Sequence, residues 1–353
     1  MPMNNNFLLY GANGYTALLI IDLCNQQGIR PTIGGRTLKN IKPLAEKHGL
    51  EYEVFSVDET QKMETVLSRF NVVLNCAGPF FRTYQPMVQA CIKTQTHYLD
   101  ITGEIDVFEG CKKLSKTAEK AGVMLMPGVG FDVVPTDCLA KALHNKMPDA
   151  THLKLAFAST EIGVSRGTKT TMIENLGSGG AIRENGKIKK VPNAYKVMKV
   201  PFMGKTLTCA TIPWGDISTA HFSTAIPNIE TYMGVNKQLI KSMKINNYLG
   251  WLFNMSWIKK RIIKKARSGK PGPDAAQRER AKVMVWGQVE NAKGEQITGN
   301  LLTPEGYKLT ALTALAATQK TLSGKLKVGF QTPSVVFGQD FIMEFEGVKR
   351  EFS

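Results

Sequence analysis

The feature that most constrains the fold of this chain is a regular alternation of short apolar segments and longer helical segments from residue 7 to about 130. Parallel strands need a crossover connection, and right-handed crossovers place helices on both faces of the sheet. The alternation therefore predicts an α/β fold with a doubly wound parallel sheet. The predicted strands are 7–10, 31–35, 51–57, 71–76, 96–101 and 123–128, and the predicted helices are 14–28, 37–48, 59–69, 84–95 and 104–121.

A second domain is expected, because 353 residues are more than one ordinary core needs. After residue 137 the regular alternation stops, and residues 281–303 alternate around "NAKGE" as in an antiparallel hairpin. We predict a doubly wound domain over 1–137 and an α+β domain with a mostly antiparallel sheet over 138–304. Residues 305–353 are expected to form helices that pack back on the first domain.

The first predicted strand ends in a glycine-rich turn, "YGANGYTA". Gly11 permits a backbone conformation that side chains disfavour, Gly14 lets the backbone approach a pyrophosphate, and Ala17 keeps the next helix close to the sheet. The helix N-terminus then offers amides and positive dipole charge to phosphate. A tight turn needs glycine even without a ligand, but its place in the first strand–helix unit favours a dinucleotide-binding Rossmann domain.

The end of the second strand indicates which nicotinamide cofactor is bound. An acid there would hold the ribose 2′-hydroxyl of NAD, but no acid occurs between Asp22 and Glu46. Arg36 instead stands where a 2′-phosphate would lie, and a guanidinium grips phosphate with paired hydrogen bonds. We therefore predict NADP(H). The alternative is a solvated arginine after a strand.

Two further loops are expected beside the cofactor. Asp58 ends the third strand at a position that often faces the adenine, although it is equally suited to cap the next helix. After the fourth strand, Ala77, Gly78 and Pro79 form a loop poor in side chains, along which the nicotinamide ribose would run.

Candidate catalytic residues follow the fifth and sixth strands, because ligands of doubly wound folds bind outside the carboxyl ends of the strands. Asp100 and Asp132 each lie in such a strand-to-loop transition and are predicted to act in catalysis or substrate positioning. The alternative for Asp132 and Thr102 is a structural role as helix caps. No metal motif is present, and the six cysteines are at least 15 residues apart, as expected of core residues in a reducing compartment.

Several stretches together resemble the saccharopine dehydrogenase-like NADP-binding family, within it the bacterial trans-acting enoyl reductases and their animal saccharopine dehydrogenase-like relatives. They are "GANGYTA", "GGR", "NCAGPF", "HYLDITGE", "PGVGFDVVPTD", "GPDAAQRERAKVMVWGQV" and "TPEGYKLTALTALAA". The resemblance spans nearly the whole chain and is weakest over 185–270. It implies a Rossmann domain followed by a substrate domain, with NADP(H) as the hydride carrier. The cofactor positions it implies are Gly11, Asn13, Gly14, Tyr15, Thr16, Arg36, Ala77, Gly78 and Pro79.

The formal net charge of +16 is concentrated in one region. Residues 187–270 hold 16 Lys or Arg against Asp216 and Glu230, a local net charge of +14. Within it, the stretch 237–270 mixes aromatic residues with lysines, and its uncharged run is too short and polar to cross a bilayer. This composition suits an anionic membrane surface or an acidic acyl-carrier protein. The alternatives are core packing or a homodimer contact, and no motif for specific nucleic-acid binding accompanies the charge.

The leading hypothesis is an NADP(H)-dependent oxidoreductase that acts on a lipid-like or acyl-thioester substrate and reduces an enoyl double bond. The second is an amino-acid-type dehydrogenase near saccharopine reductase, and the third is an NADP-binding lipid-surface adaptor without turnover. Because "MPMNNN" leads directly into a strand without an apolar leader, we expect a cytoplasmic protein, peripheral to the membrane if the basic stretch binds lipid.

Overall fold

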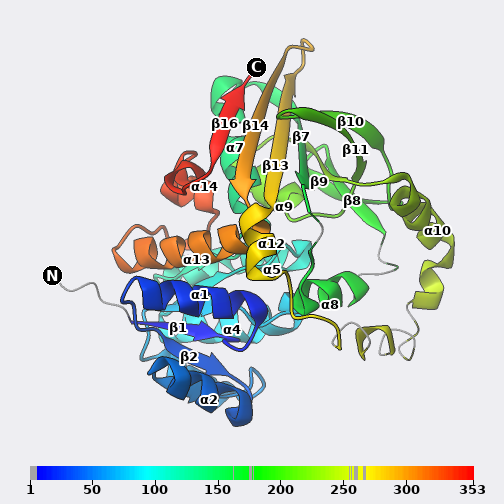
Figure 1. The fold of residues 1–353 in the computed structure, drawn as a ribbon. Coiled ribbons are helices and arrows are strands. Elements are labelled where there is room, and N and C mark those ends of the chain that lie inside the picture. The colour runs from blue at the N-terminus through cyan, green and yellow to red at the C-terminus, as the bar shows by residue number, and fades with distance from the viewer. Residues whose placement is uncertain are drawn as a thin grey trace. The chain divides into compact units, whose positions relative to one another are not determined.

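The computed structural model describes residues 6–161, 163–174, 177, 179–253, 255, 257, 261–264 and 268–353. The chain forms two compact units, coloured along the sequence in Figure 1. Unit 1 comprises Met1–Val134 and Tyr307–Gly338, and unit 2 comprises Pro135–Gly306 and Gln339–Ser353. Within the predicted basic stretch, residues 254, 256, 258–260 and 265–267 lie outside the described residues.

Unit 1 is built on a seven-stranded sheet with the order β15-β6-β5-β4-β1-β2-β3, and every pairing in it is parallel. The predicted doubly wound parallel sheet is thus confirmed. The order reverses at β1, which pairs with β2 on one side and β4 on the other, and ligands of such sheets bind at this switch point. The strands are β1 (Phe7–Tyr10), β2 (Thr32–Gly35), β3 (Tyr52–Val54), β4 (Val72–Asn75), β5 (His97–Asp100), β6 (Met124–Met126) and β15 (Gly329–Phe330).

The helices of unit 1 follow the predicted segments with two differences. The predicted helix 84–95 begins earlier, at Phe80, because the carboxylate of Glu104 accepts hydrogen bonds from the first amides of the helix. The predicted helix 104–121 is two helices that meet at Leu114. The helices are α1 (Tyr15–Gln26), α2 (Leu38–His48), α3 (Thr60–Leu67), α4 (Phe80–Thr94), α5 (Ile105–Lys113), α6 (Ser115–Lys120), α13 (Gly306–Leu322) and α14 (Pro333–Phe337).

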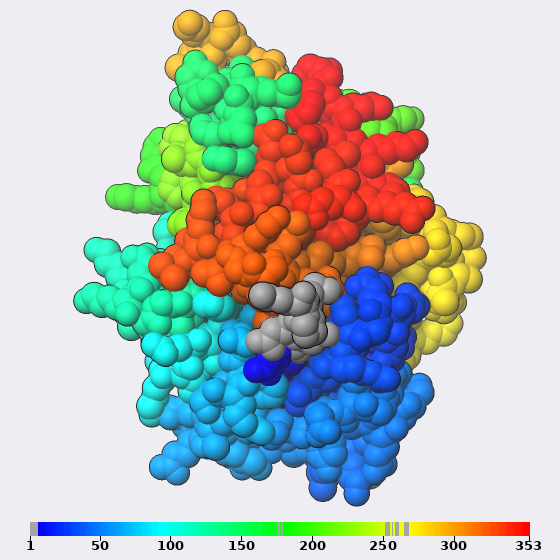
Figure 2. Space-filling view, turned by 90° about the vertical axis from the view of Figure 1, so that its left-hand side faces the viewer, coloured from blue at the N-terminus to red at the C-terminus, as the bar shows by residue number. Residues whose placement is uncertain are grey.

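The last part of the chain completes unit 1 with α13 and β15. The buried residues of α13 are mostly alanines and threonines. The Thr313 hydroxyl donates to the carbonyl of Val129 at 2.8 Å. β15 continues the sheet beyond β6. Figures 1 and 2 both place α13 (orange) beside α1 (blue), where Tyr307 and Tyr15 form a T-shaped ring contact at 5.1 Å.

Unit 2 contains a mixed, mostly antiparallel sheet, as the sequence predicted, with the order β10-β11-β12-β7-β13-β14-β16 and the β8–β9 hairpin beside β12. Among the described strands of unit 2, only the β7–β12 pairing is parallel. The expected hairpin around "NAKGE" is β13 with β14. The strands are β7 (Ala150–Ser159), β8 (Gly180–Glu184), β9 (Lys187–Val191), β10 (Val197–Phe202), β11 (Lys205–Thr211), β12 (Asn228–Gly234), β13 (Lys282–Asn291), β14 (Gln296–Pro304) and β16 (Lys349–Phe352).

The C-terminal boundary differs from the prediction of helices over 305–353 that pack on the first domain. Residues 339–353 belong to unit 2, and β16 pairs with the edge strand β14. The first segment of unit 1 ends at Val134 instead of residue 137. The C-terminal difference arises because the short strand β16 covers the exposed edge of β14, a strand that lies far from it in the sequence.

The core of unit 2 lies on both faces of its sheet. Trp286, Tyr232 and Met284 pack together on one face. On the other face α7 lies very close, because a side chain at Gly287 would come within 2.8 Å of Leu143. The remaining helices are α7 (Val134–Lys146), α8 (Arg166–Glu174), α9 (Asp216–Thr224), α10 (Lys237–Phe253), α12 (Ala275–Arg280) and the 3-10 helix η1 (Phe341–Glu344).

Candidate functional site

The glycine turn after β1 touches the loop after β4. Gly11 has a φ of 78°, and a Cβ atom there would lie 2.6 Å from the backbone nitrogen of Ala77. Its amide donates to the carbonyl of Gly34 at 2.8 Å. Glycine at this position therefore allows the turn after β1, the end of β2 and the loop after β4 to meet at the switch point of the sheet.

The N-terminus of α1 faces this junction without an internal counter-charge. Gly14 is the N-cap residue and supplies no side-chain cap, and the first turn contains no acid. The amides of Thr16 and Ala17 precede the first bond of the helical ladder, from the Leu18 amide to the Gly14 carbonyl. This is the arrangement that stabilises a phosphate at a helix N-terminus.

The other predicted residues of the turn divide between surface and packing positions. The side chain of Asn13 is exposed and lies near Gly35 at the end of β2. The ring of Tyr15 packs against Tyr307, so this side chain connects α1 with α13.

Arg36 lies directly after β2, at the edge where the turn is located. It is exposed, and no hydrogen bond or ion pair engages its guanidinium among the described residues. Its charge acts on buried Tyr10, at the end of β1: burial raises the pKa of Tyr10 to about 12, and the positive charge of Arg36 opposes that rise. The guanidinium is thus near the switch point and available to an external anion.

Asp58 lies near the same tyrosine, since its charge adds to the raised pKa of Tyr10. Its carboxylate accepts from the Ser56 hydroxyl at 3.1 Å. The interpretation of Asp58 as a helix cap is wrong, because α3 begins at Thr60 and Glu59 is its N-cap residue. Its predicted place beside the adenine stays a prediction.

The Ala77–Gly78–Pro79 loop is held by side chains that were not predicted from the sequence. Asn75 accepts from the Ala77 amide at 3.0 Å, and Thr83 donates to the Ala77 carbonyl at 2.8 Å. Beyond the loop, the two carboxylate oxygens of Glu104 accept from the amides of Phe80 and Phe81 at 2.9 and 2.8 Å. An asparagine inside an apolar strand was the signal for Asn75, because a buried amide needs partners.

Asp100 is fully buried at the end of β5. One oxygen accepts from the Tyr98 hydroxyl at 2.7 Å, and the other accepts from the amides of Thr102 and Gly128 at 3.0 and 2.8 Å. Burial still raises the pKa of Asp100 to about 7. The carboxyl group joins the loops after β5 and β6.

Asp132 lies in the loop between β6 and α7 and is partly buried. A Cβ atom on Gly103 would come within 2.7 Å of its Oδ2, so the loop after β5 packs directly on this carboxyl group. Burial, with the nearby charge of Glu104 as a second cause, raises the pKa of Asp132 to about 7. Asp132 can therefore exchange a proton near neutral pH.

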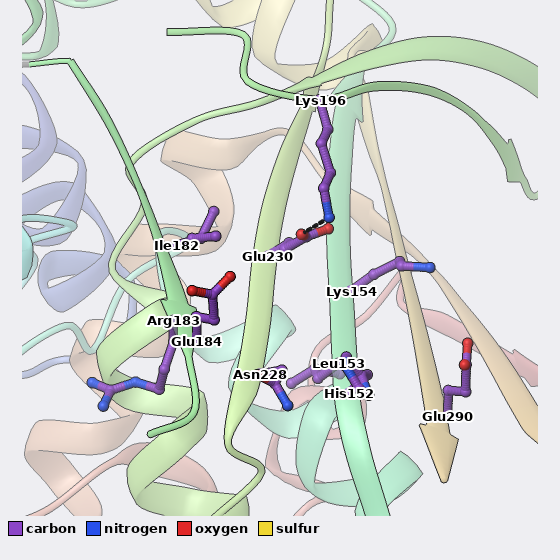
Figure 3. A pocket seen from close by; sticks show the side chains of 10 residues that line it. All are labelled: His152, Leu153, Lys154, Ile182, Arg183, Glu184, Lys196, Asn228, Glu230 and Glu290. Atoms are coloured by element: carbon purple, nitrogen blue, oxygen red, sulfur yellow. Dashed lines mark hydrogen bonds and ion pairs between the residues drawn. The ribbon is translucent and has the colours of Figure 1, made fainter. Parts of the chain in front are cut away.

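Unit 2 contains a separate polar pocket, shown in Figure 3. Lys196 reaches Glu230 within it and forms an ion pair. Three carboxylates and three basic side chains line the pocket, so their charges balance and favour neither an anionic nor a cationic ligand. The charged lining residues are Lys154, Arg183, Lys196, Glu184, Glu230 and Glu290.

Metal ligation is a further possibility for any cluster of His, Cys, Asp and Glu. Across the described ranges, no three such side chains gather in an arrangement that would hold a metal ion. The six cysteines are free thiols, five of them buried.

The fold and the site together define a dinucleotide-binding α/β protein: a Rossmann sheet with a glycine turn, an uncapped helix N-terminus and an unpaired arginine after β2. Residues 7–126 match the family model of the saccharopine dehydrogenase NADP binding domain. This match within the first unit confirms both the resemblance seen in the sequence and NADP as the cofactor.

Similar curated proteins are named as an enoyl reductase and as an oxidoreductase. A trans-acting enoyl reductase of Mycobacterium ulcerans is 24% identical over 212 residues, covering 55% of this chain and 48% of that protein. A saccharopine dehydrogenase-like oxidoreductase of Bos taurus is 25% identical over 228 residues, covering 57% and 52%. The matches thus span about half the length of these relatives.

Among solved structures, the apo saccharopine dehydrogenase (L-Glu forming) of Saccharomyces cerevisiae superposes with a TM-score of 0.67. The match covers 99% of both chains at 16% identity. At this identity the likeness shows the fold alone, and it confirms a Rossmann unit followed by a second unit with a mixed sheet.

Proposed function

We propose that this protein is an NADP(H)-dependent oxidoreductase that reduces the enoyl double bond of a lipid-like or acyl-thioester substrate. The observation that supports NADP(H) chemistry is the junction of Gly11 with the Ala77 backbone, with Arg36 unpaired at the same edge of the sheet. The proposal of an enoyl substrate rests on relatives named trans-acting enoyl reductases.

The residues present fit this cofactor. The turn from Gly11 to Thr16 and the first amides of α1 would hold the pyrophosphate, and Arg36 would bind the 2′-phosphate. Asn75 and Thr83 hold the Ala77–Pro79 loop in place for the nicotinamide ribose. When bound, NADPH supplies the hydride.

Reduction of a double bond also requires a proton, and Asp132 is the better placed of the two predicted acids to hold it. Its pKa is raised to about 7, so a substantial fraction is protonated at neutral pH. Asp100 also has a raised pKa, but it has no solvent exposure, whereas Asp132 is only partly buried. We assign Asp132 to proton transfer and Asp100 to positioning of the loops after β5 and β6.

The test is NADPH oxidation, followed by its absorbance, with enoyl thioesters of short and long acyl chains. We expect turnover that Asp132→Asn lowers about a hundredfold or more, with NADPH affinity unchanged. Asp106→Asn, an exposed acid on α5, is the matched control and should keep full activity. Equal activity of Asp132→Asn and the control would remove the proposed proton role.

Two other results would redirect the proposal. Turnover of saccharopine with NADP⁺, and none with enoyl thioesters, would favour an amino-acid-type dehydrogenase. Tight NADPH binding without oxidation by either substrate class would favour a binding protein that acts as a lipid-surface adaptor.

A further inference from the structure

The positive charge of this chain is an exposed feature of unit 2. Of the two acids among residues 187–270, Asp216 is buried and Glu230 is ion-paired with Lys196. Neither acid therefore neutralises the lysines of α10, and the sequence contains no acid between Glu230 and Asp274. The surface that carries α10 is strongly cationic.

One face of α10 is attached to the rest of unit 2. The helix starts with Asn236, whose side chain accepts from the Leu239 amide at 2.8 Å. Asn247 hydrogen-bonds with the backbone and side chain of Asn193, and Gly250 lies so close to Gly177 that a Cβ atom would approach its Cα to 3.1 Å. Met243 is partly buried along the same stripe.

The opposite face of α10 exposes apolar side chains beside lysines. At about 100° per residue, Ile245, Tyr248 and Leu249 point away from the attached stripe. They are 46%, 82% and 43% exposed. Lys241 and Lys244 are exposed about two turns and one turn before Tyr248. Figure 1 shows α10 at the periphery of unit 2, beyond the β8–β9 hairpin.

A soluble surface helix normally shows the reverse pattern, with its apolar residues toward the core. Here the apolar residues face outward, and lysines border them. Beyond α10, Trp257 is 60% exposed and Arg261 and Lys264 are exposed in the same acid-free stretch. Aromatic and aliphatic groups surrounded by lysines match the boundary between anionic headgroups and acyl chains.

We propose that the outward face of α10 docks this protein on an anionic lipid bilayer. The helix would lie in the plane of the interface, with Tyr248, Ile245 and Leu249 among the headgroups and the lysines on lipid phosphates. In the described parts of the chain, no helix has the length and apolarity to cross a bilayer, so the attachment is peripheral. A lipid surface brings an acyl substrate to the protein, but the docking itself does not depend on catalysis.

Charge complementarity and shape favour a bilayer over an acidic carrier protein or a second copy. A second copy would bring +14 against +14. The exposed apolar groups lie on a single convex helix, which presents a line of contacts to a flat and deformable surface. An anionic bilayer satisfies the charge and the apolar groups together.

The experiment is co-sedimentation of the full chain with vesicles of phosphatidylcholine alone or with phosphatidylglycerol added. We expect binding only with phosphatidylglycerol, and weaker binding as salt rises. The variant Lys237→Gln/Lys241→Gln/Lys244→Gln should bind roughly a hundredfold more weakly, since each lysine near an anionic surface contributes about a fivefold factor. Tyr248→Ser/Leu249→Ser should lower binding about tenfold, because the apolar contact is lost.

The matched control removes three exposed lysines elsewhere, in Lys113→Gln/Lys116→Gln/Lys120→Gln on α5 and α6. It has the same net charge as the α10 variant and should keep full vesicle binding. Equal losses in the two triple variants would overturn the assignment to α10. Equal binding to neutral and anionic vesicles would also overturn it. The same holds if the protein does not bind vesicles but uses Tyr248 to bind an acyl-carrier protein or to dimerise. NADPH affinity should be unchanged in every variant. Measuring it separates a loss of vesicle binding from damage to the cofactor site.

Discussion

Asp100 gives the fold a pH dependence that can be worked out from its surroundings. The group has no solvent exposure, and burial raises its pKa to about 7 although three hydrogen-bond donors favour the charged form. In the unfolded chain the pKa of an aspartate is about 3.9. Between about pH 4 and pH 7 the folded state therefore holds a proton that the unfolded state has lost.

The stabilising contribution of Asp100 is complete below about pH 4 and is lost as pH rises through 7. The asparagine side chain of the Asp100→Asn variant carries no charge at any pH, so the variant lacks this pH-dependent loss of stability. At about 1.4 kcal/mol per pKa unit, the difference in unfolding free energy between pH 5 and pH 8 should shrink by about 3 kcal/mol. At pH 5 the variant should be less stable than the original by about 1 kcal/mol, since the oxygen of Asp100 that accepts from the Tyr98 hydroxyl is replaced by an NH2 group, which cannot accept.

Urea unfolding at pH 5 and pH 8, followed by circular dichroism, measures both differences. Asp22→Asn, an exposed carboxylate on α1, is the control and should leave the pH dependence as it was. The reasoning is refuted if Asp100→Asn lowers stability equally at both pH values, because Asp100 would then be ionised throughout the range.

Two glycine substitutions test the geometry of the site. Gly11→Ala should destabilise unit 1 by more than about 2 kcal/mol and abolish NADPH binding, because the methyl group meets the Ala77 backbone. Gly28→Ala, with a similar φ but open space, should cost only about 1 kcal/mol, and equal melting temperatures of the two variants would contradict this account. Gly103→Ala should push Asp132 aside, so that turnover falls while NADPH affinity and melting temperature stay near normal; unchanged turnover would argue against a role for Asp132.

The doubly wound sheet of unit 1 was predictable because local patterns specify it. Every strand from β1 to β6 precedes a helix and all except β3 are mostly buried, so alternation alone fixes the fold class. The absence of an acid after β2, together with Arg36, is likewise local information. The antiparallel hairpin of β13 and β14 was predictable from its alternation and turn.

The elements that were missed depend on distant partners. β15 has two residues, one of them a glycine, and is a strand only because β6 offers an open edge. β16 pairs with β14 in the same way. At the site, Glu104 caps a helix that begins 24 residues before it, and Asp100 is satisfied by an amide 28 residues after it. No local pattern carries such contacts.

The recognition of the extra phosphate of NADPH by Arg36 is the central claim, and titration of the Arg36→Ala variant with NADPH and with NADH tests it most directly. Loss of a charge-assisted contact should weaken NADPH binding about tenfold to a hundredfold and leave NADH within about twofold. Arg30→Ala, at the opposite end of β2, should change neither affinity. An equal loss for NADPH and NADH in Arg36→Ala would contradict the account.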